Sequence, residues 1–473
     1  MGTDNPILNY LQEANIAYER IAHTATGSLQ QTALQCHVPP EQLARAVLLS
    51  DRHGPLLAVL PLNHVINFAQ LFALAERKLE PVDRNHARHL FPGCETGCTP
   101  PLAAPFQLPA LLDMALLDQP SIYLEAGSRT LLIKISGEDF KHLHRASAQG
   151  RFSSPAQMLQ ANDSAFVNQD HFAREHGIRQ LRPVEGIRQR LNHLHDLPPM
   201  HPLSSQLLAL HKDPTASIED LADLLEGEPS ISAQLLRNAR SAYYNYPGEI
   251  NSVAQAITQV LGFDTAIHTA LGISALRPFD LPKEGPLGLD TLWRHAMHCA
   301  LLSRSLCSLL PKHMEIKTDQ VYLAGLLHNF GFVALGHLLK PEYFLLNRVV
   351  SANPDVPITL IEKRTLGVGH TQVGDWLMQA WEMPELLRVC LREHHNETYS
   401  GPHALYANLI LLSNCLLKPY GLGDAADETP PASILNALGI TLDKARQVAQ
   451  SHMEQAAQLD ELALSISTGV QAA

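Results

Sequence analysis

The hydrophobic pattern of this chain changes its period near Leu203, and that change limits what the chain can fold into. Before residue 150 the apolar residues gather in short runs separated by turn residues, as they do in strands and hairpins. From Leu203 onward they recur at helical spacing. No segment repeats at a fixed period, which excludes a solenoid. We therefore expect a mixed α/β domain followed by an all-α domain.

The domain boundaries are placed where this periodicity starts and stops. The chain has 473 residues, ample for two independent cores. Residues 1–150 are predicted to form the N-terminal domain and 195–400 the helical domain, with a helical extension over 401–473. Residues 151–194 lack strong periodicity and contain Ser153-Ser154-Pro155 and Pro183, so we expect a connector there.

Two hairpins are expected in the N-terminal domain. The runs Ala46–Ser50 and Leu56–Leu60 are strand-like, and Asp51–Gly54 between them has the composition of a hairpin loop. A second pair of runs, Ser121–Ala126 and Leu131–Ser136, flanks Gly127 and Ser128. Together they predict part of a sheet.

Helix ends are marked by capping residues. Asp4 is placed to cap a short first helix with Ile7 and Leu11 on one face. In the helical region, Ser217 and Asp220 form a capping box and Gly227 is placed to end that helix.

The charge and composition exclude several classes of protein. The net charge is −12, and no long section has the basic excess that would hold a stretch of nucleic acid, although a short RNA end stays compatible. Seven cysteines without dense spacing favour a reducing compartment. We find no apolar run of about 18 residues and no secretory leader. The expectation is a cytoplasmic protein without a membrane anchor.

The chain has 25 histidines, an unusually large number. The order of several of them in the helical half suggests a common site. Any one of them, taken alone, is better read as a core or surface residue. Imidazoles that come from separate helices into one cavity are what a buried metal site needs. The residues in question are His295, His328, His370, His394 and His395.

The segment Ala324–Gly331, which reads AGLLHNFG, resembles the signature of the HD superfamily of metal-dependent phosphohydrolases, where the signature His is followed by Asp. His295 matches the upstream His of this family, and His370 matches the next His. The pair His394-His395 matches the paired His, and Asn408 stands at the position of the last Asp. The stretches Glu228–Ser232, Ile257–Gly262 and Trp381–Pro384, together with Trp293, narrow the resemblance to the HDOD branch.

Both acidic positions of the signature are amides here, Asn329 and Asn408. An amide offers a neutral oxygen but neither balances the charge of a divalent cation nor bridges two of them. HDOD domains resemble their catalytic relatives in fold and act as non-catalytic signalling modules. The resemblance thus implies a domain that works through protein partners, with a vestigial site that could hold a divalent transition metal weakly.

The N-terminal domain resembles the YbaK/prolyl-tRNA synthetase-associated domain, which edits mischarged aminoacyl-tRNA. The matching stretches are Leu43–Leu49, Leu57–Pro61, Cys94–Pro101, Leu112-Asp113 and Ile122–Gly127. In the family a strand Lys projects into the pocket, and a Gly-x-x-x-Pro loop shapes the pocket and supplies backbone donors.

The loop is kept here, but the lysine position is Arg45. A guanidinium is planar and permanently charged, so it binds anions but cannot relay a proton at neutral pH. Without a ligand, Arg45 would be an exposed strand residue and the loop a tight turn. The candidate pocket comprises Arg45, Gly97, Pro100, Pro101 and Gly127. Cys94 and Cys98 lie in the same loop without the further ligands that a metal site needs.

Two functions compete on this evidence. In the first, the N-terminal pocket senses an aminoacyl group, an amino acid or a tRNA end, and the HDOD domain passes that state to protein partners. In the second, the chain is an aminoacyl-tRNA deacylase regulated by its HDOD domain. Arg45 and the two asparagines favour the first, and the intact loop keeps the second open. Phosphodiesterase chemistry at the histidines ranks last.

Overall fold

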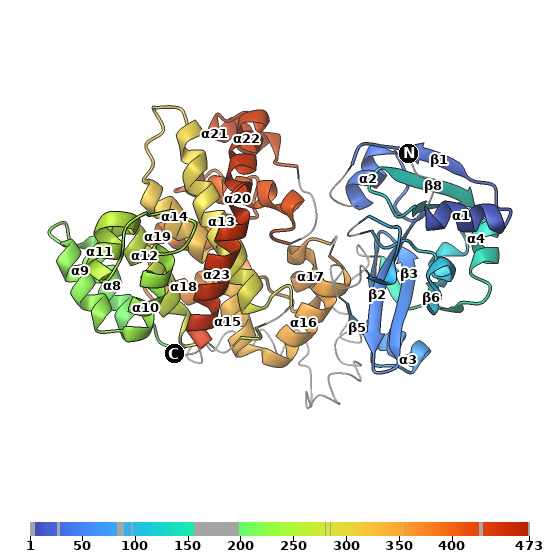
Figure 1. Cartoon of the computed structure of the whole chain (residues 1–473), viewed down its shortest axis with the longest axis horizontal. Helices are drawn as coiled ribbons and strands as arrows, with labels where there is room; N and C mark the ends of the chain where they lie inside the picture. Colours follow the sequence, from blue (N-terminus) through green and yellow to red (C-terminus); the bar gives the residue numbers. More distant parts are fainter. Residues whose placement is uncertain are drawn as a thin grey trace. The chain divides into compact units, whose positions relative to one another are not determined.

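The computed structural model describes residues 5–25, 29–82, 89–95, 98–155, 198–279, 281–283, 285–354, 356–424 and 429–471. These residues form two compact units (Figure 1). The first contains the described N-terminal residues up to Pro155 together with Phe344–Gly367 and Asp424. The second contains the rest of the described helical region. The predicted fold class, α/β followed by all-α, is confirmed.

The first unit is built on a mixed sheet with the strand order β1-β8-β7-β2-β3-β6-β9, and β5 adds to β2. The hairpins β2–β3 and β7–β8 are antiparallel, whereas β7 lies parallel to β2 and β6 parallel to β3. The strands are β1 (Glu19–Ala22), β2 (Leu43–Asp51), β3 (Gly54–Pro61), β5 (Glu80–Pro81), β6 (Ala110–Asp113), β7 (Ser121–Glu125), β8 (Leu131–Ser136) and β9 (Ala148–Gly150).

Both predicted hairpins form, and the first is tighter than expected. Asp51 pairs directly with Gly54, so the loop is Arg52-His53 alone. Gly54 has a φ of +102°, which glycine adopts without the strain a side chain would bring. The Asp51 carboxylate accepts a hydrogen bond from Arg77 Nε at 3.1 Å and fixes the turn.

The sheet is buried on both faces. On β2, Ala44, Ala46 and Leu48 belong to the main core, which also holds residues of α1 (Pro6–Glu13) and α4 (Gly137–Leu143). Alternation sends Leu43 to the opposite face, where it packs with residues in and after α2 (Leu29–Gln35). The first helix is capped by Asn5, whose side chain accepts from two backbone N–H groups, whereas the sequence analysis predicted Asp4 as the cap. Asp4 lies outside the described residues.

The second unit is a bundle arranged around the long helix α13, which packs against α14, α20 and α23. The capping box of Ser217 and Asp220 is present and Gly227 follows α9 as predicted. The helices are α8 (Pro202–Lys212), α9 (Ile218–Glu226), α10 (Pro229–Ala239), α11 (Val253–Ala256), α12 (Phe263–Leu276), α13 (Leu289–Leu306), α14 (Thr318–Leu327), α15 (Phe330–Leu338), α18 (His370–Ala380), α19 (Glu385–Glu393), α20 (Ala404–Leu417), α21 (Ala432–Leu438), α22 (Leu442–Met453) and α23 (Ala456–Gln471).

Two segments fall in the first unit although the sequence pattern placed them elsewhere. Ser153–Pro155, expected in the connector, forms strand β10 and pairs with β4 (His64–Ile66). The Ser153 hydroxyl also donates to the Asp113 carboxylate at 2.7 Å, which holds this strand to the domain. Phe344–Gly367, expected in the helical domain, contains α17 (Ile358–Thr365) and most of α16 (Lys340–Ala352). The remainder of the predicted connector lies outside the described residues.

One segment, Thr318–Leu338, is long and apolar enough to cross a membrane by length and composition. It comprises α14 and α15, and 89% of its most apolar window is buried inside the protein. Burial of that kind is expected of a core helix pair in a soluble domain.

Candidate functional site

Four of the five predicted histidines lie at or just beyond the end of a helix, and the fifth lies within a helix. His328 follows the last residue of α14, His394 follows that of α19, and His370 opens α18. His295 lies within α13. Gly331 brings two of these ends together, since a Cβ there would lie 1.8 Å from the His370 carbonyl oxygen. Only glycine allows α15 to approach the start of α18 this closely.

The five imidazole rings are in contact as one connected cluster. Ring centroids are 5.2 Å apart for His295 and His328, 4.9 Å for His328 and His394, and 5.3 Å for His394 and His370. His395 lies 4.3 Å from His394 and 5.2 Å from His370. We call these five residues the histidine cluster.

Hydrogen bonds fix the tautomers of the two innermost rings. His328 donates from Nδ1 to the Gly325 carbonyl at 2.7 Å, and His394 donates from Nδ1 to the Leu391 carbonyl at 2.9 Å. The Nε2 atoms therefore carry the lone pairs. Burial, reinforced by the neighbouring histidines, holds the pKa of both rings well below the usual value, so both are neutral.

The histidine cluster fits a transition metal in its donor atoms. His370 Nε2 and His394 Nε2 are 3.2 Å apart, close to the roughly 3.3 Å that separates two nitrogen ligands on a tetrahedral ion. His328 Nε2 is buried without a hydrogen-bond partner, as are the side-chain oxygens of Asn329 and Asn408. Imidazoles and neutral amide oxygens could hold one such ion, but they supply no anionic bridge for a second.

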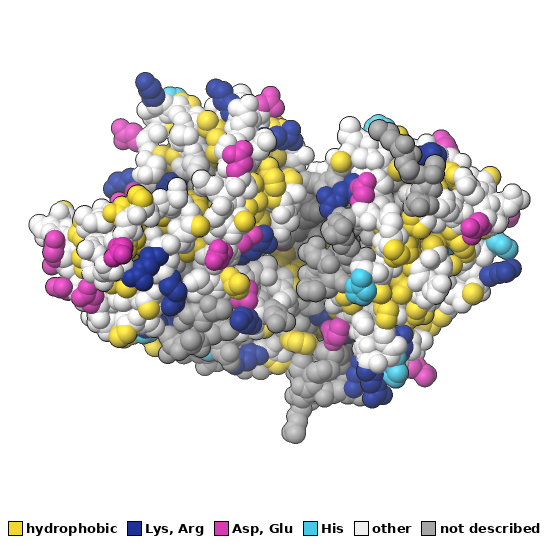
Figure 2. All heavy atoms as spheres, in the orientation of Figure 1, with side chains coloured by type: hydrophobic (Ala, Val, Ile, Leu, Met, Phe, Trp, Pro, Cys, Tyr) yellow, Lys and Arg dark blue, Asp and Glu magenta, His cyan; other side chains and the backbone are white. Residues whose placement is uncertain are grey.

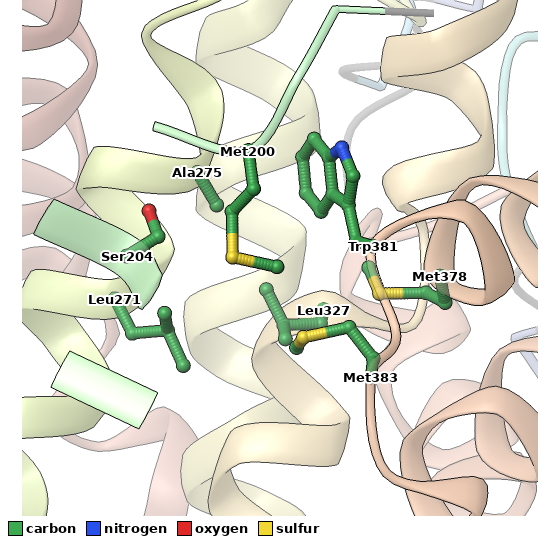
Figure 3. A pocket seen from close by; sticks show the side chains of 8 residues that line it. All are labelled: Met200, Ser204, Leu271, Ala275, Leu327, Met378, Trp381 and Met383. Carbon is green, nitrogen blue, oxygen red and sulfur yellow. The ribbon is translucent and has the colours of Figure 1, made fainter. Parts of the chain in front are cut away.

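An apolar hollow lies beside the helix that carries His328. Leu327 lines it, and Figure 3 shows three methionine side chains and the Trp381 indole gathered around it. Its polar atoms are already engaged: Trp381 Nε1 donates to the Pro198 carbonyl at 3.0 Å, and the Ser204 hydroxyl bonds that of Ser274 at 2.7 Å. The hollow has no polar group left to orient a ligand, and we assign it a packing role.

In the first unit, Arg45 lies on the sheet face opposite the main core. Arg45 pairs with Leu60 on β3, and it is the next residue on β2 after Ala44, which pairs with Leu124 on β7. Arg45 and Glu125 are the next residues along the two strands, and because strand residues alternate between faces, both belong to this face of the sheet. We call it the Arg45 face.

Arg45 is not an exposed strand residue, which the sequence analysis expected it to be if it bound no ligand. Its side chain is 2% exposed and is surrounded by acceptors. Nη2 donates to the Asn353 side-chain oxygen at 2.7 Å and to the His64 carbonyl at 2.9 Å, and Nη1 donates to the Ala352 carbonyl at 3.3 Å. The guanidinium is thus held by the end of α16.

The loop that completes the pocket is anchored beside Glu125. The Thr99 backbone N–H donates to the Glu125 carboxylate at 3.0 Å. Pro100 and Pro101 are buried, and the Pro101 carbonyl accepts from His144 Nε2 at 3.1 Å. Gly97 lies outside the described residues.

Gly127 is brought against the same loop. It has a φ of +72°, and a Cβ there would lie 2.6 Å from Cys94 Sγ. Cys94 and Cys98 are free thiols whose pKa values are raised by burial and by Glu125, that of Cys94 to about 11. Neither thiol belongs to a group of three or more potential metal ligands among the described residues.

Two family models match this chain. The aminoacyl-tRNA editing domain matches residues 23–143 and the HDOD domain matches residues 197–397. The chain contains an editing domain followed by an HDOD domain. The editing-domain match covers Arg45, His64 and Glu125, whereas Ala352 and Asn353, which accept from Arg45, fall inside the HDOD match.

One solved structure is similar to nearly the whole chain, and other relatives match part of it. A candidate signal transduction protein from Marinobacter aquaeolei VT8 is 25% identical, covers 98% of this chain and 99% of its own, and has a TM-score of 0.77. An HDOD protein from Geobacter sulfurreducens is 20% identical over 59% of this chain and 96% of its own, with a TM-score of 0.49. An uncharacterised protein of Treponema pallidum (strain Nichols) is 23% identical over 50% of this chain, which spans only 44% of that relative.

Sequence reasoning missed the residues that engage Arg45 and the loop. Glu125 was inside a matched stretch, and its position next to Arg45 could have been inferred from a parallel pairing of the two strands. Asn353 had no such signal, because it is 308 residues away from Arg45 and in another family match. Its role became visible only in the folded chain.

Proposed function

We propose that the protein is a cytoplasmic regulatory protein, in which the editing domain binds an aminoacyl group or tRNA end and the HDOD domain passes that state to a protein partner. The observation that carries the proposal is the environment of Arg45. A residue at the position of the editing lysine is buried and bound by Asn353 and Ala352. Both of these residues lie within the HDOD family match.

Hydrolysis of an aminoacyl ester needs an oriented water and groups that stabilise the developing oxyanion. Arg45 cannot relay a proton, and its donors already point at protein acceptors. A carboxylate or phosphate of a ligand would instead compete with Asn353 for the guanidinium. Binding would thereby release the end of α16, which gives the HDOD residues a means of responding to the ligand.

At the histidine cluster we propose binding without phosphohydrolysis. Phosphohydrolysis uses metal-bound water and anionic ligands that balance or bridge cations. The cluster offers neutral imidazoles, and Asn329 and Asn408 stand where the carboxylates would be. A metal held here would act as a structural centre, with His370, His394 and His395, whose ligand atoms lie within 4.8 Å of one another, among its ligands.

A second candidate function, aminoacyl-tRNA deacylation, is favoured by the loop. Thr99 is anchored through its backbone to Glu125, and Pro100-Pro101 are buried beside it. A loop held in this way could still present backbone donors to an oxyanion, a contribution worth roughly 10²–10³ in rate per donor elsewhere.

The test compares wild type with Arg45→Lys and Asn353→Ala on a panel of mischarged tRNAs, measuring binding and deacylation separately. Lys363→Ala, an exposed change on α17, is the matched control. We expect wild type to bind at least one member with little turnover, and Asn353→Ala to bind it more tightly. Rapid deacylation by wild type that Arg45→Lys does not increase would replace the regulatory function with the enzymatic one.

The histidine cluster is tested with cyclic dinucleotides and nucleoside phosphates in the presence of Mn²⁺, Fe²⁺ or Mg²⁺. We expect no product, and we expect the double variant Asn329→Asp/Asn408→Asp to bind more metal because each change adds an anionic oxygen. Turnover of about 1 per second or more that His328→Ala abolishes would contradict the proposal.

A further inference from the structure

A second group of potential ligands lies in the HDOD domain away from the histidine cluster. His211 is near the end of α8, His268 is in the middle of α12, and Asp319 is in the first turn of α14. Their ligand atoms all lie within 4.8 Å of one another. None of the three belongs to the motif that matched the HD signature.

His268 is the residue that needs explaining. Its side chain is 1% exposed, yet neither ring nitrogen has a hydrogen-bond partner. A neutral imidazole has one N–H to donate and one lone pair to offer, and buried polar groups of this kind are normally satisfied. An unsatisfied pair of nitrogens in a core helix is expensive unless something binds there.

The surroundings hold the ring in a defined orientation. His211 meets it edge to face, with the ring centroids 4.7 Å apart, and Tyr322 stacks on it at 6.4 Å. The Tyr322 hydroxyl is hydrogen-bonded to Thr269 at 3.3 Å, so it is engaged beside His268 and not with it. Burial lowers the pKa of His268 to about 3, which keeps the ring neutral with a lone pair available.

We propose that His211, His268 and Asp319 form a site for a divalent first-row transition ion such as Zn²⁺. Two imidazoles and one carboxylate are a donor set that such ions accept. Ligand atoms on one ion lie about 3 Å apart, so the three must close by an ångström or two. His211 and Asp319 are only partly buried and have the freedom to do this, whereas His268 stays fixed.

The site would join three helices at one point. It ties α8 and α12 to the start of α14, the helix whose far end is followed by His328. Because His211 and Asp319 are partly exposed, an ion bound here would be accessible to water. The ion would therefore stabilise the bundle and leave room for an additional ligand.

The test measures Zn²⁺ bound to the full chain after chelator treatment, by equilibrium dialysis and elemental analysis. The variants are His211→Ala and Asp319→Asn, and the controls are His313→Ala and Glu315→Gln, exposed residues just before α14. Wild type and controls should bind one more ion than the variants. The affinity loss should exceed the roughly 10–100-fold caused by removing an outer partner of a metal ligand.

Two further measurements keep the result independent of the histidine cluster and of folding. His328→Ala should keep the ion at the proposed site, and its zinc X-ray absorption should show two imidazoles. Zn²⁺ should raise the melting temperature of the controls more than that of Asp319→Asn, which preserves the side-chain shape. Equal zinc content and affinity in variants and controls, or no zinc in His328→Ala, would overturn the proposal.

Discussion

Arg45 is a buried cation that donates to backbone and side-chain oxygen acceptors. Asn353 is the centre of this arrangement. Its side-chain oxygen accepts from Arg45 at 2.7 Å and from the Ile66 backbone at 3.2 Å, and its amide donates to the Val349 carbonyl at 2.7 Å. Buried polar groups that are satisfied on every side fix a unique packing. Arg45 is thus a structural residue that ties β2 to the end of α16.

Another buried residue of the editing domain, His144, gives a pH dependence. Burial lowers the pKa of His144 to about 4, against 6.5 for an unperturbed ring. Between these values the unfolded chain takes up a proton that the folded chain does not, so stability is complete above about pH 6.5 and falls as the pH drops to about 4. The loss from this residue is on the order of 3 kcal/mol.

The measurement for His144 is the urea midpoint of the editing domain, read by hydrogen exchange at β3 amides at pH 7.5 and 5.0. His144→Gln, which can still donate to the Pro101 carbonyl, should be less sensitive to pH than wild type. Equal sensitivity in both proteins would show that His144 does not take up the proton.

At the residue scale, the histidines could be predicted and Asn353 could not, for a physical reason. Motif order preserves which helix ends meet, so His328 and His394 could be inferred to approach each other. A hydrogen bond between Arg45 and Asn353 depends on how a distant segment folds back, and no local pattern encodes that. His268 was missed because it occupies a core position of α12 and resembles any buried residue there.

Helix positions in the HDOD domain depend on close backbone contacts. Replacing Gly331 by Ala should destabilise the protein by about 3 kcal/mol or more, because the new Cβ would meet the backbone of His370 and overpacking of rigid atoms is costly. Gly227→Ala is the control, since its Cβ would only reach ordinary contact at 3.4 Å and its φ is −62°.

Tryptophan fluorescence reports on the unfolding of the second unit, because Trp293, Trp376 and Trp381 all lie in it. The urea midpoint should fall in Gly331→Ala and stay near the wild-type value in Gly227→Ala. A midpoint for Gly331→Ala that matched Gly227→Ala would mean that α15 and α18 can move apart without cost.

The last helix, α23, is held to α13 by a polar network. Asp460 accepts from Arg294 through two bonds, at 2.5 and 2.8 Å, and from His298 Nε2 at 3.0 Å, while His298 Nδ1 is 3.0 Å from His452 Nε2. The predicted C-terminal extension is therefore part of the bundle. The sequence predicted a helical extension over 401–473, but nothing in its periodicity indicated which helix it would pack on.

Asp460→Asn should weaken that attachment by about 1 kcal/mol, a small value because the Arg294 and Asp460 side chains are 39% and 34% exposed. The neighbouring exposed change Glu461→Gln is the control. Hydrogen exchange in α23 should accelerate in the first variant and not in the second. Equal exchange rates would show that apolar packing alone holds α23.

For the molecule as a whole, charge argues for recognition of a small ligand. Figure 2 shows basic and acidic side chains interspersed over the described surface of the face in view, without a continuous basic stripe. A net charge of −12 opposes non-specific binding along a nucleic acid. In the function proposed above, a tRNA end would therefore be recognised by shape and by a few polar contacts, and the main body of the tRNA would gain little from the protein surface.

The two family matches share one packed unit through Asn353, and this can be measured without any ligand. In a double-mutant cycle of Arg45→Met and Asn353→Leu, we expect a coupling energy of about 2 kcal/mol. Either single change leaves the other partner buried without its hydrogen bond, so the second change costs less than it does alone. The readout is the unfolding free energy of the editing domain in the full chain. Arg45→Met combined with the exposed change Lys363→Ala should be additive within about 0.5 kcal/mol. If the Arg45 and Asn353 changes were also additive, the end of α16 would be indifferent to the guanidinium, and a ligand that captured Arg45 would have no route to the HDOD residues.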